Sequence, residues 1–117
     1  MPFVKAPPTG IQAMKEKAGN RFVGTLEAYE EVLEGSFKDE KGDPKPDHFY
    51  TFRIEESNFP GMRTGEAYRF AAPTRFHREI CKFPDVLTTQ RFEVTYTGEE
   101  KTKFGGKAAN FTILRDE

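Results

Sequence analysis

Hydrophobic and polar residues alternate most regularly near the end of the chain. Within Arg91–Thr97, the apolar residues Phe92, Val94 and Tyr96 occupy every second position, which is typical of a β-strand with one buried face. The same period of two recurs in three further segments, His48–Ile54, Glu66–Phe70 and Ala108–Leu114. The pattern therefore predicts four strands, over residues 48–54, 66–70, 91–97 and 108–114.

Another strand is predicted upstream, over Arg21–Leu33, and it is longer and less regular. It contains Gly24, and a glycine inside a strand often marks a bulge or a sharp bend. The part Leu26–Leu33 could instead form a helix, because Glu and Ala favour helices. We expect a strand, since Phe22 and Val23 begin the segment and a hairpin follows it.

A helix is predicted over Pro73–Phe83, where Phe76, Ile80 and Phe83 recur at helical spacing. Pro84 ends this helix, because proline disfavours helical backbone in the residue before it. Three strands, one helix and two strands, in that order, is the layout of an OB-fold, a small partly open barrel that often grips single-stranded nucleic acid. We therefore predict a mainly β protein, with a five-stranded OB-fold barrel over residues 21–117 and one helix between strands three and four.

Residues 1–20 are predicted to be a flexible N-terminal arm that lies outside the core. Pro2, Pro7 and Pro8 block regular pairing, and chain termini are mobile by default. The segment Ile11–Ala18 could form two turns of helix. Such an arm could lie on nucleic acid or on another subunit.

Phenylalanine dominates the large apolar residues, with 12 Phe and no Trp among the 117 residues. A chain of this length holds one core, which must be built largely from Phe rings. The formal net charge of −1 argues against a strong, indiscriminate polyanion binder. The charge is uneven, because residues 27–47 hold eight acids and three bases, which leaves eleven acids and fifteen bases elsewhere. A basic face and an evenly mixed surface both remain open.

The sequence shows no catalytic or metal-binding pattern. His48 and His77 lie far apart without a motif, and His77, between Arg75 and Arg78 on the predicted helix, is expected to be solvated. Cys81 is the one cysteine, so no internal disulfide can form, and we expect a partly buried structural thiol. No phosphate loop or nucleophile elbow occurs. We expect no enzyme activity, no cofactor and no metal ion.

The sequence also contains no recognisable sorting signal. No apolar run of about 18 residues predicts a membrane span, and the first residues lack the apolar core of a signal peptide. A single cysteine suits a reducing compartment. We therefore expect a cytoplasmic location, which would be the host cytoplasm for a viral protein, and no membrane partner.

The candidate binding chemistry is aromatic and cationic, because single strands are held by bases stacked on exposed rings and by a positive groove along the phosphates. Alternation puts Phe49 and Arg53 on the face opposite the core, with Arg69 on the next strand. The predicted nucleic-acid-binding residues are Phe49, Arg53, Arg69, Phe37, Lys101, Lys103, Phe104 and Lys107. Structural alternatives stay open: Phe49 could pack under the arm or against a second sheet, and the two arginines could pair with Glu55 or Glu66.

Residues 91–113, RFEVTYTGEEKTKFGGKAANFTI, combine an alternating strand, Thr-Gly, a Lys-rich loop, Gly-Gly-Lys and a strand with Asn-Phe-x-Ile. This section resembles the last hairpin of small OB-fold single-stranded-DNA-binding proteins of tailed bacteriophages. The resemblance implies non-catalytic binding of single-stranded DNA, with low sequence preference, in phage replication, recombination or repair.

The same resemblance suggests partners: single-stranded DNA, further copies of the chain, and replication or recombination proteins. Many relatives recruit such proteins with a long acidic tail, and Arg115-Asp116-Glu117 is too short for one, so we do not expect recruitment by the C-terminus. An OB-fold adaptor between proteins and a virion structural component are the alternative functions.

Overall fold

The protein is described from a computed structural model, which covers residues 9–33, 42, 45–83, 88–103 and 105–116. Five strands form one antiparallel sheet: β1 (Arg21–Val32), β2 (Asp47–Ser57), β3 (Ala67–Ala71), β4 (Arg91–Lys101) and β5 (Lys107–Arg115). Two short helices accompany it, α1 (Gly10–Met14) and α2 (Thr74–Ile80). The prediction of a mainly β protein with a helix between the third and fourth strands is confirmed.

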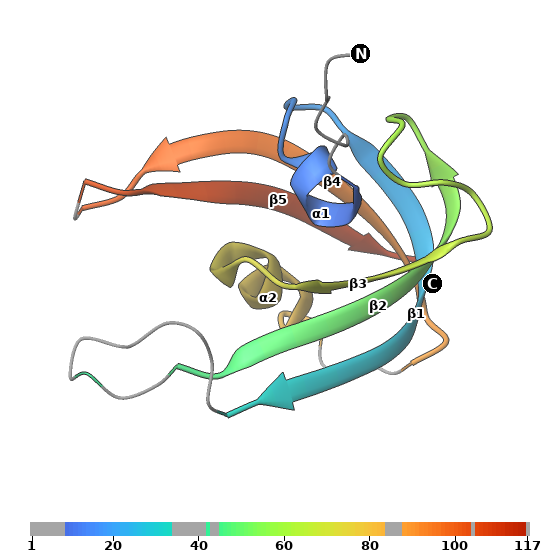
Figure 1. Ribbon diagram of the computed structural model, residues 1–117, viewed down its shortest axis with the longest axis horizontal. Coiled ribbons are helices and arrows are strands. Elements are labelled where there is room, and N and C mark those ends of the chain that lie inside the picture. The colour runs from blue at the N-terminus through green and yellow to red at the C-terminus, as the bar shows by residue number, and fades with distance from the viewer. Residues whose placement is uncertain (1–8, 34–41, 43–44, 84–87, 104, 117) are drawn as a thin grey trace, which may run out of the picture.

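The strand order is β3-β2-β1-β4-β5, so β1 lies in the middle of the sheet. β1 pairs with β2 along almost its whole length and with β4 through Arg21–Thr25. The sheet is strongly bent, and the β1–β2 and β4–β5 pairs form two arms that extend to the same side of the molecule, with α2 between them (Figure 1). Within the described residues, β3 and β5 are edge strands and the sheet is not closed into a barrel.

The bend in β1 lies where the sequence predicts it. The register of β1 against β2 shifts between Val23 and Gly24, and again between Leu26 and Ala28. A Cβ atom at Gly24 would lie 2.8 Å from the backbone oxygen of Arg53, so only glycine allows the two backbones to approach this closely. β1 remains a strand as far as Val32, which confirms the strand and excludes the helical alternative.

The core consists largely of Phe rings, as the composition predicts. Phe22, Phe52, Phe76 and Phe92 are fully buried, and Phe52 meets Phe76 and Phe92 edge to face, an arrangement that suits the ring quadrupoles. The alternation in β2 is confirmed for Tyr50, Phe52 and Ile54, which are buried, whereas His48, expected on the same core face, is only partly buried. The core therefore lies on the concave side of the bent sheet.

Helix α2 fills the gap between the two edge strands. Phe76 packs edge to face against Phe70 of β3, with ring centroids 5.3 Å apart, and against Phe111 of β5, with centroids 5.4 Å apart. On one side of Phe76, Arg75 bonds to Glu100 and Asn110 of the β4–β5 arm. Side chains of α2 thus connect edges that no backbone hydrogen bonds join within the described part of the chain.

Helix α1 corrects the prediction for the N-terminal segment. Ile11, Ala13 and Met14 are buried and belong to the same hydrophobic core as the strands, and the Gly10 N–H donates to the Gly61 oxygen at 2.9 Å. The placement of residues 1–20 outside the core is therefore wrong for Gly10–Met14, while residues 1–8 lie outside the described part. The apolar spacing of Ile11 and Met14 outweighs the turn signals of the preceding prolines.

We predict that Met14→Ala lowers the free energy of unfolding by about 2–5 kcal/mol, because it removes a fully buried side chain and leaves a cavity. Gln12→Ala on the exposed side of the same helix is the matched control and should change stability by less than about 0.5 kcal/mol. Urea unfolding at neutral pH measures both. Equal stability of the Met14→Ala variant and the wild type would show that α1 is not part of the core.

Candidate functional site

Phe49, Arg53 and Arg69 lie on the convex outer face of the β1–β2–β3 region, opposite the core. Phe49 pairs with Ala71 and Arg69 with Thr51, so Phe49 and Arg69 are diagonal neighbours on one face. The Arg69 guanidinium lies over the Phe49 ring, 4.0 Å from its centroid. The structure therefore brings these predicted residues together, and it covers Phe49 with Arg69.

Both arginines are held by carboxylates. Arg53 Nε donates to Glu27 at 2.8 Å, and this hydrogen bond raises the pKa of Arg53. Arg69 Nη2 donates to Glu30 at 3.1 Å. Exposed ion pairs of this kind are worth about 0–1 kcal/mol, so a phosphate could displace the carboxylates, but the nearby negative charge would oppose it. The outer face is therefore balanced in charge.

The partners of these arginines differ from the two that the sequence suggested. Glu55 pairs with Arg91, with Nε and Oε2 2.6 Å apart, and Glu66 accepts a hydrogen bond from the Tyr68 hydroxyl at 2.9 Å. Glu27 lies in the second irregularity of β1, where the register changes. The bulge thus determines which acid reaches Arg53.

The predicted lysines lie at the end of the β4–β5 arm. Lys101 and Lys107 are opposite each other in the register, and Lys103 lies in the turn between the strands. Lys107 Nζ is 3.9 Å from Glu99, whereas no carboxylate of the described residues forms an ion pair with Lys101 or Lys103. This end of the arm carries the positive charge that phosphates require. It is separate from β2 and β3, which carry Phe49 and Arg69 (Figure 1). Phe37 and Phe104 lie outside the described residues.

A cluster of four rings joins α2 to the β1–β2 arm, and the sequence analysis missed it. The imidazoles of His48 and His77 stack with centroids 3.6 Å apart and planes 7° apart. His48 Nδ1 is hydrogen-bonded to the Tyr29 hydroxyl at 2.6 Å, and His77 Nδ1 to the Tyr50 hydroxyl at 2.7 Å. We call Tyr29, His48, Tyr50 and His77 the ring cluster. The expectation of a solvated His77 is wrong, because α2 turns this side chain toward β2.

Burial governs the titration of the ring cluster. Desolvation, followed by repulsion from His48, lowers the pKa of His77 below its ordinary value, and Glu31 opposes this only in part. Burial also raises the pKa of the Tyr29 and Tyr50 hydroxyls, so both stay protonated. Near neutral pH, His77 is therefore uncharged, and it offers a flat ring rather than a cation.

Cys81 is exposed, which corrects the expectation of a partly buried thiol. Its Sγ lies 3.5 Å from Nε2 and 3.8 Å from Nδ1 of His77. Because the sulfur is almost equally far from both nitrogens, it does not lie along the lone pair of either, as a thiol activated by a histidine base would. The pair therefore lacks the alignment of a nucleophile and its base.

Two hollows adjoin the ring cluster. One, of about 450 Å³, is lined by Leu26, Tyr29, Tyr50, His77, Ile80, Cys81 and Thr88. The other, of about 730 Å³, includes Lys15, Lys45, Gln12, His48, Thr74 and His77 in its lining. His77 borders both, so the hollows meet at the ring cluster. One offers apolar and aromatic walls, and the other adds two ammonium groups.

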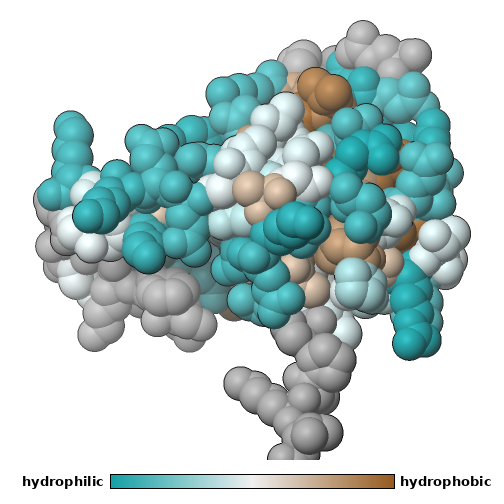
Figure 2. All heavy atoms as spheres, turned by 90° about the horizontal axis from the view of Figure 1, so that it is seen from above, coloured by the Kyte–Doolittle hydropathy of each residue, from teal (hydrophilic) through white to brown (hydrophobic). Residues whose placement is uncertain are grey.

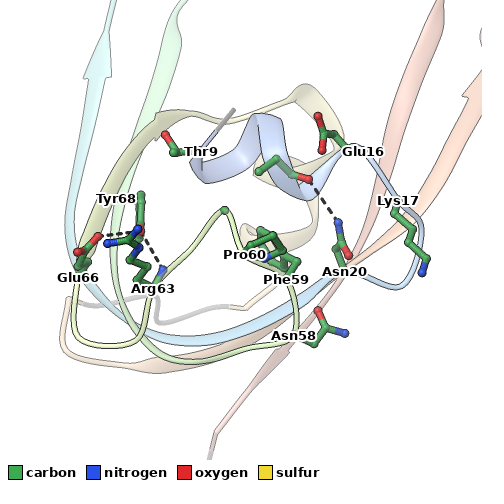
Figure 3. A pocket seen from close by; sticks show the side chains of 12 residues that line it. Thr9, Glu16, Lys17, Asn20, Asn58, Phe59, Pro60, Arg63, Glu66 and Tyr68 are labelled. Carbon is green, nitrogen blue, oxygen red and sulfur yellow. Dashed lines mark hydrogen bonds between the residues drawn. The ribbon is translucent and has the colours of Figure 1, made fainter. Parts of the chain in front are cut away.

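A third hollow, of about 710 Å³, lies between α1 and the β2–β3 connection (Figure 3). Its polar side chains bond within the protein: the Tyr68 hydroxyl donates to Glu66 and accepts from the Arg63 N–H, and Asn20 donates to the Met14 oxygen. These bonds hold the turn and α1 in place. This hollow therefore has a structural explanation.

No protein-family model, curated protein or solved structure matches the chain.

Within the described residues, no group of three or more His, Cys, Asp or Glu side chains could hold a metal ion. No helix in that part of the chain is both long and apolar enough to cross a membrane. On the face shown in Figure 2, hydrophilic side chains predominate and hydrophobic ones form separate spots. Function must be argued from the two arms and the ring cluster.

We predict that acid destabilises the protein partly through His77. Its folded pKa is below the unfolded value of about 6.5, so the unfolded chain binds more protons between these two values. Stability is then fully present above about pH 6.5 and falls as the pH drops toward the folded pKa. Urea unfolding between pH 7.5 and 5.5 should show a steeper loss for the wild type than for His77→Gln, which keeps a polar partner for Tyr50. Parallel curves would contradict this prediction.

Proposed function

We propose that this protein binds single-stranded DNA with low sequence preference and without catalysis. In this proposal the bent sheet is an OB-fold whose seam between β3 and β5 is filled by α2 rather than closed by strand pairing. One observation carries the proposal: the two arms extend to the same side, and one ends in lysines while the other carries the ring cluster (Figure 1). Phosphates and bases require these two kinds of side chain.

Phosphate contacts are assigned to the β4–β5 arm. Lys101 and Lys103 have no carboxylate partner among the described residues, and Lys107 is held only weakly, at 3.9 Å from Glu99. A phosphate that approaches these ammonium groups does not have to displace a closely bound carboxylate. The release of counterions from the strand can then favour binding. Affinity should therefore depend on salt mainly through this arm.

Base contacts are assigned to exposed or partly exposed rings. Tyr29 of the ring cluster is 44% exposed, and every base has a face that can stack on such a ring. On the outer face, the planar Arg69 guanidinium over Phe49 is a second stacking surface. Arg53 and Arg69 are weaker phosphate ligands than the lysines, because Glu27 and Glu30 already neutralise them.

The biological setting of the proposal rests on the resemblance of residues 91–113 to phage proteins. That resemblance supports a role in DNA replication, recombination or repair in the host cytoplasm, with replication or recombination proteins and further copies of the chain as partners. The balanced charges on the outer face favour a second candidate, an adaptor that binds another protein there. A protein with this second function would bind no DNA.

We predict that the full chain binds fluorescent oligo-dT. The affinity of the double variant Lys101→Gln/Lys103→Gln for oligo-dT should depend less steeply on the salt concentration. Two phosphate contacts on a single strand contribute about 1.4 to the slope of log affinity against log salt, and the variant should lose that amount. Lys17→Gln/Arg63→Gln, which changes two cations at the third hollow, is the control of equal charge and should keep the slope. Fluorescence anisotropy over a series of salt concentrations measures all three proteins.

Duplex DNA of the same length completes the test, since its bases are not available for stacking. Weaker binding to the duplex than to oligo-dT is expected. No binding of oligo-dT at low salt would remove the proposed function and favour the adaptor. Equal slopes for the two double variants would show that the β4–β5 arm does not contact the phosphates.

A further inference from the structure

The hollow of about 450 Å³ beside the ring cluster has the composition of a ligand site. Its walls are the aromatic side chains Tyr29, Tyr50 and His77 and the aliphatic side chains Leu26 and Ile80. Its size falls within the range of about 300–1,000 Å³ that is usual for small-molecule sites, which are mostly apolar with a few polar groups. The hollow lies where α2 faces the β1–β2 arm.

Two of the rings that line this hollow, Tyr29 and His77, are almost parallel to each other and to the neighbouring His48, whereas Tyr50 is tilted by 45° to Tyr29. Tyr29 is inclined by 10° to His48 and by 12° to His77, with centroids 5.9 and 6.3 Å away. Because the Tyr29 hydroxyl is bonded to His48 Nδ1, Tyr29 lies beside the stack of imidazoles and not within it. A planar ring that enters the hollow parallel to these rings would extend the stack, at the side where Tyr29 is 44% exposed.

Few polar groups line the hollow, and they do not form a hydrogen-bonding pattern that would distinguish one base from another. The Thr88 hydroxyl and the Cys81 thiol belong to residues of its walls. His77 Nδ1 is already bonded to Tyr50, which leaves this ring little capacity for a ligand. A ring held here would be held mainly by stacking, which is tolerant of base identity.

We infer that this hollow is a base site, which takes one unstacked nucleobase, and that the adjoining hollow holds the phosphate beside it. Lys15 and Lys45 line the second hollow, which shares His77 with the first, so two lysine side chains border the hollow through which the backbone of that nucleotide would leave. This inference rests on the proposed function and adds a particular location to it.

Thymidine is the probe for the base site, because it has a base and no phosphate. The chain has two histidines, both in the ring cluster, so their imidazole Cε1–H signals report on the site directly by proton NMR. We expect thymidine to shift the His77 signal in a saturable manner, with a dissociation constant on the order of millimolar, as for a small ligand with few polar contacts. Inorganic phosphate, as the second probe, reaches the histidines only from the adjoining hollow, so any shift that it causes should survive Tyr29→Ala, whereas the thymidine shift should not.

Two variants at one position separate ring stacking from hydrogen bonding. Tyr29→Phe keeps the ring and loses the bond to His48, and it should keep the response to thymidine. Tyr29→Ala should abolish that response and weaken the affinity for oligo-dT roughly tenfold, the effect of losing one stacked base. Thermal unfolding of both variants shows whether either one is misfolded. The thymidine response and the oligo-dT affinity of Tyr29→Ala are then compared with those of the folded Tyr29→Phe variant.

The outcomes distinguish the base site from the proposed function. If oligo-dT binds the wild type and Tyr29→Ala equally and thymidine causes no shift, the base site is wrong while DNA binding stands. If thymidine shifts His77 and oligo-dT does not bind, the proposed function is wrong and the hollow is a site for nucleosides alone. A shift with phosphate and none with thymidine would overturn the base site and assign the effect to an anion.

Discussion

The structure depends on Phe76 in the gap between β3 and β5. A bent sheet with two free edges exposes the apolar face on its concave side unless another element covers it. Phe76 is fully buried there and meets Phe70 and Phe111, one ring from each edge strand. Three consecutive residues of α2 then point to different parts of the sheet, because successive helical side chains are about 100° apart. Arg75 bonds to the β4–β5 arm, Phe76 enters the core, and His77 stacks on the β1–β2 arm.

This arrangement couples the candidate site to the core. The ring cluster exists because Phe76 fixes the rotation of α2, which brings His77 to within hydrogen-bond distance of Tyr50. The salt bridge of Arg75, with Nη1 and Glu100 Oε2 3.1 Å apart, lowers the pKa of Glu100 and joins the same helix to the arm that carries the lysines. A movement of α2 would therefore change the distance between the lysines of the β4–β5 arm and the ring cluster. Side-chain closure of the sheet permits such a movement more readily than backbone pairing would, since it involves fewer hydrogen bonds.

Local patterns predicted most of the fold, and contacts between distant segments were beyond their reach. Period-two alternation predicted which face of β2, β3 and β4 is buried, and Gly24 predicted the bend in β1. Both features depend on neighbouring residues alone. The stack of His48 on His77 needs the rotation of α2 relative to β2, and neither residue has a motif that would suggest it. The partners of Arg53 and Arg69 depend on the register across the β1 bulge, so the sequence suggested Glu55 and Glu66 where the structure has Glu27 and Glu30. Closure of a barrel likewise depends on pairing between β3 and β5, which no local signal reports.

The distribution of charge bears on which nucleic acid this surface could hold. Residues 27–47 are rich in acids, and two of these acids neutralise the arginines on the outer face, so that face has no strong attraction for a polyanion. Among the described residues, the cations that form no ion pair are spread over the hollows, α2 and the β4–β5 arm, so each surface offers only a few phosphate contacts; they are Lys15, Lys17, Lys45, Arg63, Arg78, Lys101 and Lys103. A duplex offers phosphates and hides its bases, whereas a single strand offers both, so only the single strand can add stacking to the weak electrostatic attraction. Under the proposed function, selectivity for single strands would therefore arise from stacking rather than from a dense positive surface, which is compatible with the formal net charge of −1.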